Sequence, residues 1–162
     1  MAKHVVPTPE ETRTIAAEAK KSRARIRTKR GDIVFTFYPL DAPVTVASFV
    51  KLARGGFYDG LTFHRVEPKF VIQGGCPNGD GRGDAGYKLK AEFNARPHVE
   101  GTVAMARAQD PDSAGSQFYI CLGDARFLDN QYTVFGQVSE GMDVVKQIRR
   151  GDVMEQVLIE DV

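Results

Sequence analysis

The sequence predicts a mainly β domain, a closed barrel or a sandwich, with two packed helices and a short helical extension at the N-terminus. Through the middle of the chain, short apolar runs alternate with Gly- and Pro-rich turns, which is typical of such all-β folds. Only two stretches after the extension have a helical period. The length of 162 residues, with 42% hydrophobic and 27% charged residues, is typical of one soluble domain.

The first predicted elements are a helix and a hairpin. Residues 8–11 (Thr-Pro-Glu-Glu) form a capping box with proline at the first helical position, and they predict a helix to about residue 21. Its one large apolar residue is Ile15, so this helix needs a surface to lie on. A strand over 23–29 then turns at Gly31 into a second strand rich in β-formers.

A second helix is predicted to begin at Asp41, with apolar residues on one face, and to end at Gly55. A third begins at Ser139 and ends at Gly151. The remaining runs favour strands, at 62–66, 70–73, 102–105, 117–121, 132–138 and 157–159. The pattern contains no internal repeat and no second domain. The favoured architecture is therefore one β barrel carrying two helices.

Composition excludes several classes of protein. No run approaches the roughly 18 apolar residues of a membrane span, and the N-terminus lacks the apolar core of a secretion signal. Two cysteines, Cys76 and Cys121, cannot make a disulfide framework. We therefore expect a cytoplasmic protein that makes no membrane contact.

The net charge of +1 hides an uneven distribution. Residues 1–30 hold nine Lys or Arg against three Glu, and Lys20–Arg30 alone holds seven basic residues. Such a run raises the possibility of nucleic-acid binding. However, Arg23, Arg25 and Arg27 alternate with smaller or apolar residues, which favours a strand with one solvated face, and no aromatic side chain lies nearby to stack on bases. Nucleic acid is thus an unfavoured partner.

Other chemistry-bearing motifs lack their structural context. The glycines at 81, 83 and 86 match a dinucleotide fingerprint, but no strand precedes them and no helix follows. The histidines are scattered, so we expect no metal and no cofactor. His64 next to Arg65 favours a structural histidine over a general base. What remains is a cation and two amides, Arg65, Gln73 and Gln117, on strands rich in aromatic residues, as in a ligand site.

Ordered motifs resemble those of the cyclophilin family. They are Gly56–Val66, Phe70–Gly75, Ala114–Ile120, Phe127–Asp129 and Val134–Gly136. The resemblance runs from about Arg23 to Glu160, so residues 1–22 are predicted to be an extension and residues 23–162 the domain. It implies a closed, eight-stranded antiparallel barrel capped by two helices, and peptidyl-prolyl cis-trans isomerase activity.

The same resemblance implies roles for individual residues. Arg65 is similar to the family's catalytic arginine, and Gln73 to the residue that orients the substrate carbonyl. The walls of the proline pocket are expected at Phe70, Val71, Phe118 and Leu128. The other substrate-binding positions are Ala106, Arg107, Gln117, Phe127 and Tyr132, with Ala106 and Arg107 acting through their backbone. Phe127 stands where relatives often have tryptophan, which implies weak cyclosporin binding.

The predicted function is acceleration of rotation about X–Pro bonds in protein clients, assisting their folding without a covalent intermediate. We expect a monomer whose partners are proline-containing peptides and unfolded or folded proteins. The alternative is a proline-peptide binding module or chaperone with incidental catalysis. The presence of Arg65, Phe70, Gln73 and Phe118 together favours the enzyme, because binding alone would not need the arginine.

Overall fold

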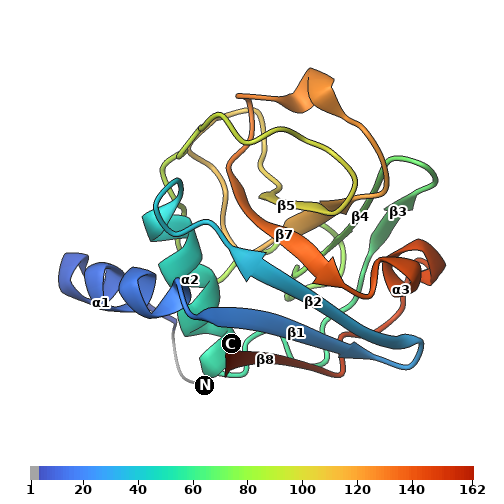
Figure 1. Ribbon diagram of the computed structural model, residues 1–162, viewed down its shortest axis with the longest axis horizontal. Coiled ribbons are helices and arrows are strands. Elements are labelled where there is room, and N and C mark those ends of the chain that lie inside the picture. Colours follow the sequence, from blue (N-terminus) through green and yellow to red (C-terminus); the bar gives the residue numbers. More distant parts are fainter. Residues whose placement is uncertain (1–3) are drawn as a thin grey trace.

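One eight-stranded antiparallel sheet, curled into a half-barrel, dominates the computed structural model, which describes residues 4–162 (Figure 1). The strands are β1 Ser22–Thr28, β2 Gly31–Phe37, β3 Arg65–Glu67, β4 Val71–Gly74, β5 Thr102–Met105, β6 Phe118–Cys121, β7 Val134–Glu140 and β8 Gln156–Asp161. Their order across the sheet is β3-β4-β6-β5-β7-β2-β1-β8. The predicted mainly β class with eight antiparallel strands is confirmed.

The two edges of the sheet meet through irregular segments. Residues 60–63, just before β3, bond to residues 151–154, just before β8. Gly60 N–H donates to the Met154 carbonyl at 2.7 Å, and Phe63 N–H donates to the Asp152 carbonyl at 2.9 Å. The closure predicted for the barrel is thus made outside the regular strands.

Three α-helices accompany the sheet: α1 Pro9–Ala19, α2 Pro43–Arg54 and α3 Met142–Gln147, with a 3-10 turn, η1, at Arg126–Leu128. The capping box predicted for α1 is present. The start predicted for the last helix is wrong, because β7 continues to Glu140 and Gly141, with a φ of 86°, then turns the chain into α3. No helix within residues 4–162 is long and apolar enough to cross a bilayer.

The basic run at the start of the domain forms β1. Ala24 and Ile26 are buried, whereas Arg23 and Arg25 point outward. Both outward arginines bond to Glu160 on the adjacent β8, at 2.8 and 2.9 Å. The predicted solvated strand face is confirmed, and part of its positive charge is balanced within the fold.

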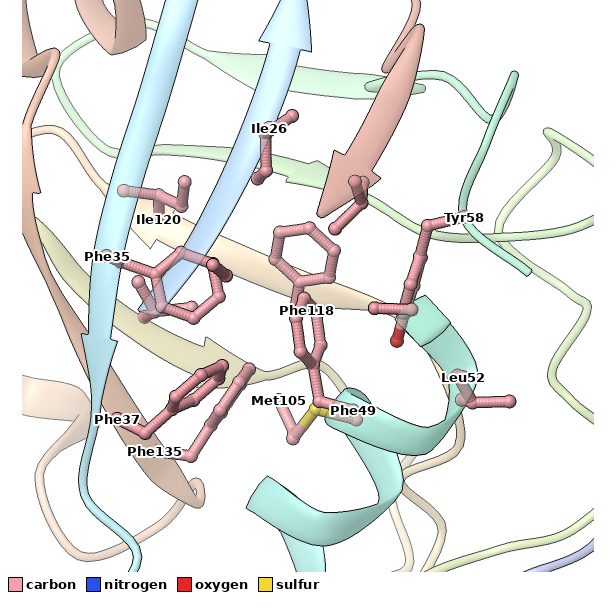
Figure 2. Close-up of a cluster of buried hydrophobic side chains, with 14 of the residues drawn as sticks. Ile26, Phe35, Phe37, Phe49, Leu52, Tyr58, Met105, Phe118, Ile120 and Phe135 are labelled. Atoms are coloured by element: carbon pink, nitrogen blue, oxygen red, sulfur yellow. The ribbon is translucent and has the colours of Figure 1, made fainter. Parts of the chain in front are cut away.

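The main core fills the inside of the barrel with aromatic rings (Figure 2). Phe49 of α2 stacks on Tyr58 with ring centroids 4.9 Å apart, and its edge contacts Phe35 and Phe118. Each of these rings is at most 2% exposed. Because α2 inserts Phe49 among the strands, this helix is part of the core.

Helix α1 packs on the outside of α2 (Figure 1). Its buried residues are Ile15 and Ala19, and Lys51 of α2 bonds to Glu11 at 3.1 Å. The extension is therefore docked on the domain, and β1 begins at Ser22, one residue before the predicted boundary.

Candidate active site

A second, smaller apolar cluster lies on the face of the central strands opposite to the main core. A pocket is located at this cluster. Side chains alternate along a strand, so β4 and β6 send one set of residues into the barrel and the other set to this face. The pocket has a volume of about 210 Å³. It is lined by Arg65, Phe70, Val71, Gln73, Ala106, Arg107, Tyr119, Leu128 and Tyr132.

A chain of hydrogen bonds orients the Arg65 guanidinium at the pocket. Arg65 faces Gln73 across the β3–β4 pair, and its Nη1 donates to Gln73 Oε1 at 3.1 Å. Because arginine only donates, the Gln73 oxygen must face it, and Gln73 Nε2 then donates to Gln117 Oε1 at 3.1 Å. Gln117 Nε2 in turn donates to the carbonyls of Gly81 and Gly83. The arginine is thus aimed by two amides anchored on a backbone loop.

The rest of the Arg65 side chain is available to contact a ligand. It is 48% exposed, and its one ion pair within residues 4–162 is a long contact of 3.5 Å to Glu67. A cation held at one end and open at the other can reach a polar group of a ligand in the pocket. The predicted grouping of Arg65 with Gln73 is found in the structure.

The prediction that Phe118 forms a pocket wall is wrong. Phe118 is fully buried and points into the barrel against Phe49 (Figure 2). Its neighbour Tyr119 lines the pocket instead. The sequence held the signal, because Gln117 and Phe118 are consecutive on a strand and cannot share a face, whereas Gln117 and Tyr119 can.

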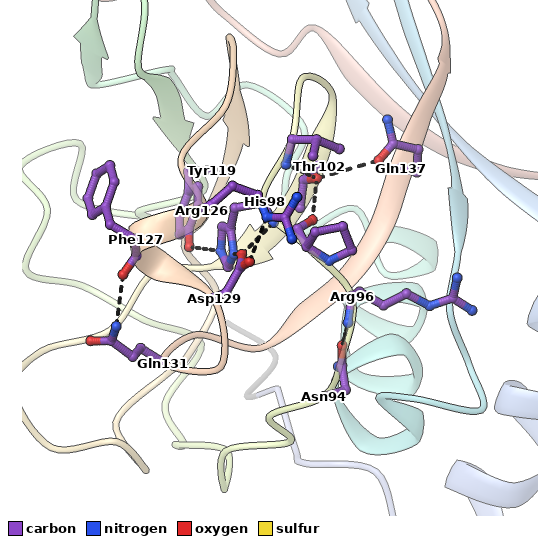
Figure 3. A network of polar contacts seen from close by, with 12 residues as sticks. Asn94, Arg96, His98, Thr102, Tyr119, Arg126, Phe127, Asp129, Gln131 and Gln137 are labelled. Carbon is purple, nitrogen blue, oxygen red and sulfur yellow. Dashed lines mark hydrogen bonds and ion pairs between the residues drawn. The ribbon is translucent and has the colours of Figure 1, made fainter.

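Tyr119 is held from behind by a buried polar network (Figure 3). His98 is fully buried, with Nδ1 3.1 Å from Asp129 Oδ1 and Nε2 2.8 Å from the Tyr119 hydroxyl. A carboxylate accepts, so Nδ1 carries the proton, and the Tyr119 hydroxyl donates to Nε2. The backbone N–H of His98 also donates to Asp129 Oδ1 at 2.7 Å. Sequence reasoning missed this support, because its residues lie far apart in the chain.

Burial sets the protonation states in this network. It lowers the pKa of His98, against the opposing effect of Asp129, so the imidazole is neutral at pH 7. It also raises the pKa of Tyr119 well above the usual value, so the hydroxyl keeps its proton. For Asp129, burial alone would raise the pKa, but hydrogen bonds from His98 and Arg126 lower it overall. One donor therefore matches one acceptor at each contact.

Arg107 shapes the opposite rim of the pocket through its side chain as well as its backbone. Its guanidinium lies over the Tyr132 ring, 4.6 Å from the centroid, and donates to the carbonyls of Gln131, Ala108 and Gln109. The chain at Ala106 continues beyond β5, and its N–H donates to the Gln117 carbonyl at 3.0 Å. Arg107 thus ties two loops together beside the pocket.

Two predicted residues lie beside the pocket, outside its lining. Gln117 lines an adjoining hollow of about 180 Å³ that shares Gln73, Ala106 and Arg107 with the pocket. Phe127 is 69% exposed and stacks on Phe70, with centroids 5.7 Å apart. Both are close enough to meet a ligand longer than the pocket itself.

His64 does not line the pocket, in keeping with the structural role favoured from the sequence. Burial and the charge of Arg65 lower its pKa. Cys76 and Cys121 are both buried free thiols. Among residues 4–162, no group of His, Cys, Asp or Glu is arranged to hold a metal ion.

Comparison with known sequences identifies close relatives. The family model for cyclophilin-type peptidyl-prolyl cis-trans isomerases matches residues 23–162. A peptidyl-prolyl cis-trans isomerase of Synechococcus elongatus is 49% identical over 140 residues, covering 85% of this chain and 96% of the relative. Peptidyl-prolyl cis-trans isomerase B of Bacillus subtilis is 50% identical over 130 residues, covering 79% and 90%.

Solved structures share the fold. A cyclophilin-type isomerase of Cryptosporidium parvum, crystallised in the presence of the dipeptide Ala-Pro, has a TM-score of 0.80 and 25% identity. The alignment covers 86% of this chain and 99% of that one. Both kinds of comparison agree with the fold described above.

Proposed function

The chain belongs to the cyclophilin-type peptidyl-prolyl cis-trans isomerases, and from this premise we propose that Arg65 stabilises the twisted prolyl amide during rotation. The observation that carries the proposal is the Arg65 guanidinium, held by Gln73 at a pocket whose walls include Phe70, Leu128 and Tyr119. The proline ring lies against Phe70, Leu128 and Tyr119. No covalent intermediate forms.

The energetics of the reaction suit such a site. The peptide C–N bond has a rotation barrier of about 18–20 kcal/mol, and X–Pro bonds isomerise in about 10–100 s unaided. A typical enzyme rate of about 10–1,000 per second requires a barrier lower by about 3–7 kcal/mol. Catalysis of this size does not require a nucleophile.

Arg65 favours the transition state selectively. While the amide is planar, its nitrogen lone pair is delocalised and accepts hydrogen bonds poorly. Rotation localises the pair, so a guanidinium at that atom binds the twisted state more strongly than the planar one. A hydrogen bond to a charged group contributes about 1.5–3 kcal/mol. The apolar walls supply the remainder by favouring the less polar twisted amide.

The backbone beyond β5 suits an extended substrate. In the described part of the chain, the Ala106 carbonyl and the Arg107 N–H form no hydrogen bond, so both are open to a peptide backbone. We assign the substrate class as extended proline-containing segments of proteins, and the physiological role as assistance in folding.

Two measurements test this function. A protease-coupled assay on an Ala-Pro tetrapeptide should show acceleration proportional to enzyme concentration. Refolding of a protein with a slow proline-limited phase should speed up in the same way, whereas its fast phases should not change. Binding of the tetrapeptide without acceleration would refute the enzyme and favour a binding module.

We expect kcat/KM to change by less than about two-fold between pH 6.5 and 8.5. Arginine stays protonated over this range. The pKa values of His64 and His98 are lowered from about 6.5, so the neutral form of each ring predominates throughout it. Initial rates in constant-ionic-strength buffers check this. A titration with a midpoint near pH 7 would implicate a histidine in the reaction.

Deleting residues 1–20 should lower stability and spare catalysis. The truncation exposes the face of α2 that Ile15 covers, which should cost about 2 kcal/mol of unfolding free energy. No pocket residue lies in α1 or α2, so kcat/KM should stay within about three-fold, an effect below 1 kcal/mol. Urea unfolding and the coupled assay measure both quantities. A folded truncation that is ten-fold slower would show that α1 shapes the pocket.

A further inference from the structure

A second groove lies between the C-terminal end of α3 and the turn that joins β3 to β4. Its volume is about 950 Å³. The lining residues are Arg30, Val66, Pro68, Lys69, Leu122, Val145, Lys146, Gln147, Ile148, Arg149 and Arg150. This α3 groove shares no residue with the catalytic pocket. The isomerase mechanism makes no use of it.

The charge of the α3 groove is one-sided. Five of its lining residues are cationic and none is acidic. Asp152 neutralises Arg30, and Glu100 neutralises Lys146. The other three cations, Lys69, Arg149 and Arg150, are exposed and form no ion pair within residues 4–162. Among the described residues, the groove therefore offers a ligand three cations that have no ion-pair partner.

The apolar part of the groove indicates what kind of anion fits. Val66, Leu122, Val145 and Ile148 are aliphatic, and no aromatic side chain lines the groove. Binding of single-stranded nucleic acid relies on aromatic rings that stack on bases. Aliphatic residues surrounded by cations instead complement a peptide whose aliphatic side chains are flanked by Asp or Glu.

Lys69 has a backbone conformation that is energetically unfavourable for any residue other than glycine. Its φ is 64°, in the left-handed region where glycine is the favoured residue. Glycine here would relieve strain and would also remove one of the three free charges. This position therefore allows the charge to be tested without damage to the fold.

The two sites share strand β3 as a common wall. Arg65 lines the catalytic pocket, and the next residue, Val66, lines the α3 groove, because successive side chains of a strand point to opposite faces. A client bound in the groove would raise the effective concentration of its own prolines at the pocket.

We propose that the α3 groove binds acidic segments of client proteins, with an aliphatic residue seated on Val66 and Leu122 between the cations. This goes beyond isomerisation, because it describes a docking site that selects clients. The proposal rests on the cyclophilin assignment only for its role in client selection: the binding tests use a proline-free peptide, so their outcome does not depend on whether the catalytic mechanism is correct.

The probe is a fluorescein-labelled peptide, Glu-Asp-Leu-Ile-Glu-Asp, titrated with the full chain and followed by anisotropy. Binding should weaken as salt rises, and the Asn/Gln analogue of the peptide should not bind. In NMR titrations, the amide signals of Lys69, Leu122 and Arg149 should shift, while those of Gln73 and Ala106 should not. Shifts confined to the catalytic pocket would overturn the proposal.

Two groove variants provide the mutational test. Lys69→Gly and the double variant Arg149→Gln/Arg150→Gln should weaken binding about three-fold and about ten-fold, respectively. The matched control is Arg13→Gln/Lys20→Gln, which removes two exposed charges from the region of α1 and should leave binding unchanged. Equal weakening in the control would mean that net charge, and not the groove, attracts the peptide.

Measurements of KM and kcat test whether the groove selects clients. With a short Ala-Pro peptide, the groove variants should match the unmodified enzyme. With the acidic hexapeptide joined to Ala-Pro by a flexible linker, KM should rise in the variants while kcat stays constant. Binding of a poly-dT oligonucleotide as tight as that of the peptide, with the same sensitivity to Arg149→Gln/Arg150→Gln, would overturn the peptide assignment.

Discussion

Arg65→Ala is expected to lower kcat/KM by about one to two decades while leaving peptide affinity nearly unchanged. The substitution removes a charged hydrogen-bond donor, worth about 1.5–3 kcal/mol, from the transition state. Phe70, Leu128 and Tyr119 remain to hold the proline ring. Coupled kinetics give the rate, and NMR titration gives the affinity.

Two further variants distinguish the contribution of the orientation of the Arg65 guanidinium from that of its positive charge. Arg65→Lys should rescue only partly, because an ammonium lacks the planar fork that Gln73 orients. Gln73→Leu keeps the guanidinium and removes its acceptor, so it should lower kcat more than it raises KM. If Arg65→Ala weakens binding as much as it slows turnover, the arginine is a binding residue and the proposed mechanism is wrong.

His98→Leu is expected to lower the free energy of unfolding by about 2–4 kcal/mol, although leucine is similar in size. The buried Tyr119 hydroxyl and one oxygen of Asp129 would each lose a partner, and an unsatisfied buried polar group costs about 1–3 kcal/mol. Tyr119 also lines the catalytic pocket, so kcat/KM should fall as well. Urea unfolding measures the stability.

A double-mutant cycle isolates the His98–Tyr119 contact. Tyr119→Phe alone leaves His98 Nε2 without a partner, but in His98→Leu it removes an orphaned hydroxyl. The double variant should therefore be more stable than additivity predicts, by about 1–2 kcal/mol. The control is His64→Leu, because His64 Nδ1 already lacks a partner in the described residues. It should change stability by less than about 1 kcal/mol. Strict additivity would show that the contact contributes nothing.

Local patterns of the sequence predicted much of the fold. The capping box at Thr8 begins α1 where expected, and the alternation around Ile26 forms β1 with its arginines outside. These features depend on residues within a few positions of one another, so they can be recognised without knowing the tertiary structure. The boundary of α3 was missed because the positive φ of Gly141, and not a helical period, ends β7.

Some residues of the candidate site were predicted correctly from the sequence and one was not. Arg65, Gln73 and Leu128 were assigned through motifs, and the structure places them around one pocket. Phe118 was assigned to the wrong face, since both it and Tyr119 are aromatic residues of one apolar run. The alternation of side chains along the strand places Tyr119, and not Phe118, on the face of Gln117, and the pairing of β6 with β4 and β5 fixes that arrangement.

The sequence by itself determined the β class, the order of the elements and the arginine at the centre of the site. The tertiary structure alone decided three further features: the place where the barrel closes, between residues 60–63 and 151–154, the support of Tyr119 by His98, and the cationic groove beside α3. Each of these joins segments distant in the chain. Local propensity and periodicity carry no information about such contacts, because the free energy that forms them comes from packing and hydrogen bonds made only when the whole sheet has assembled.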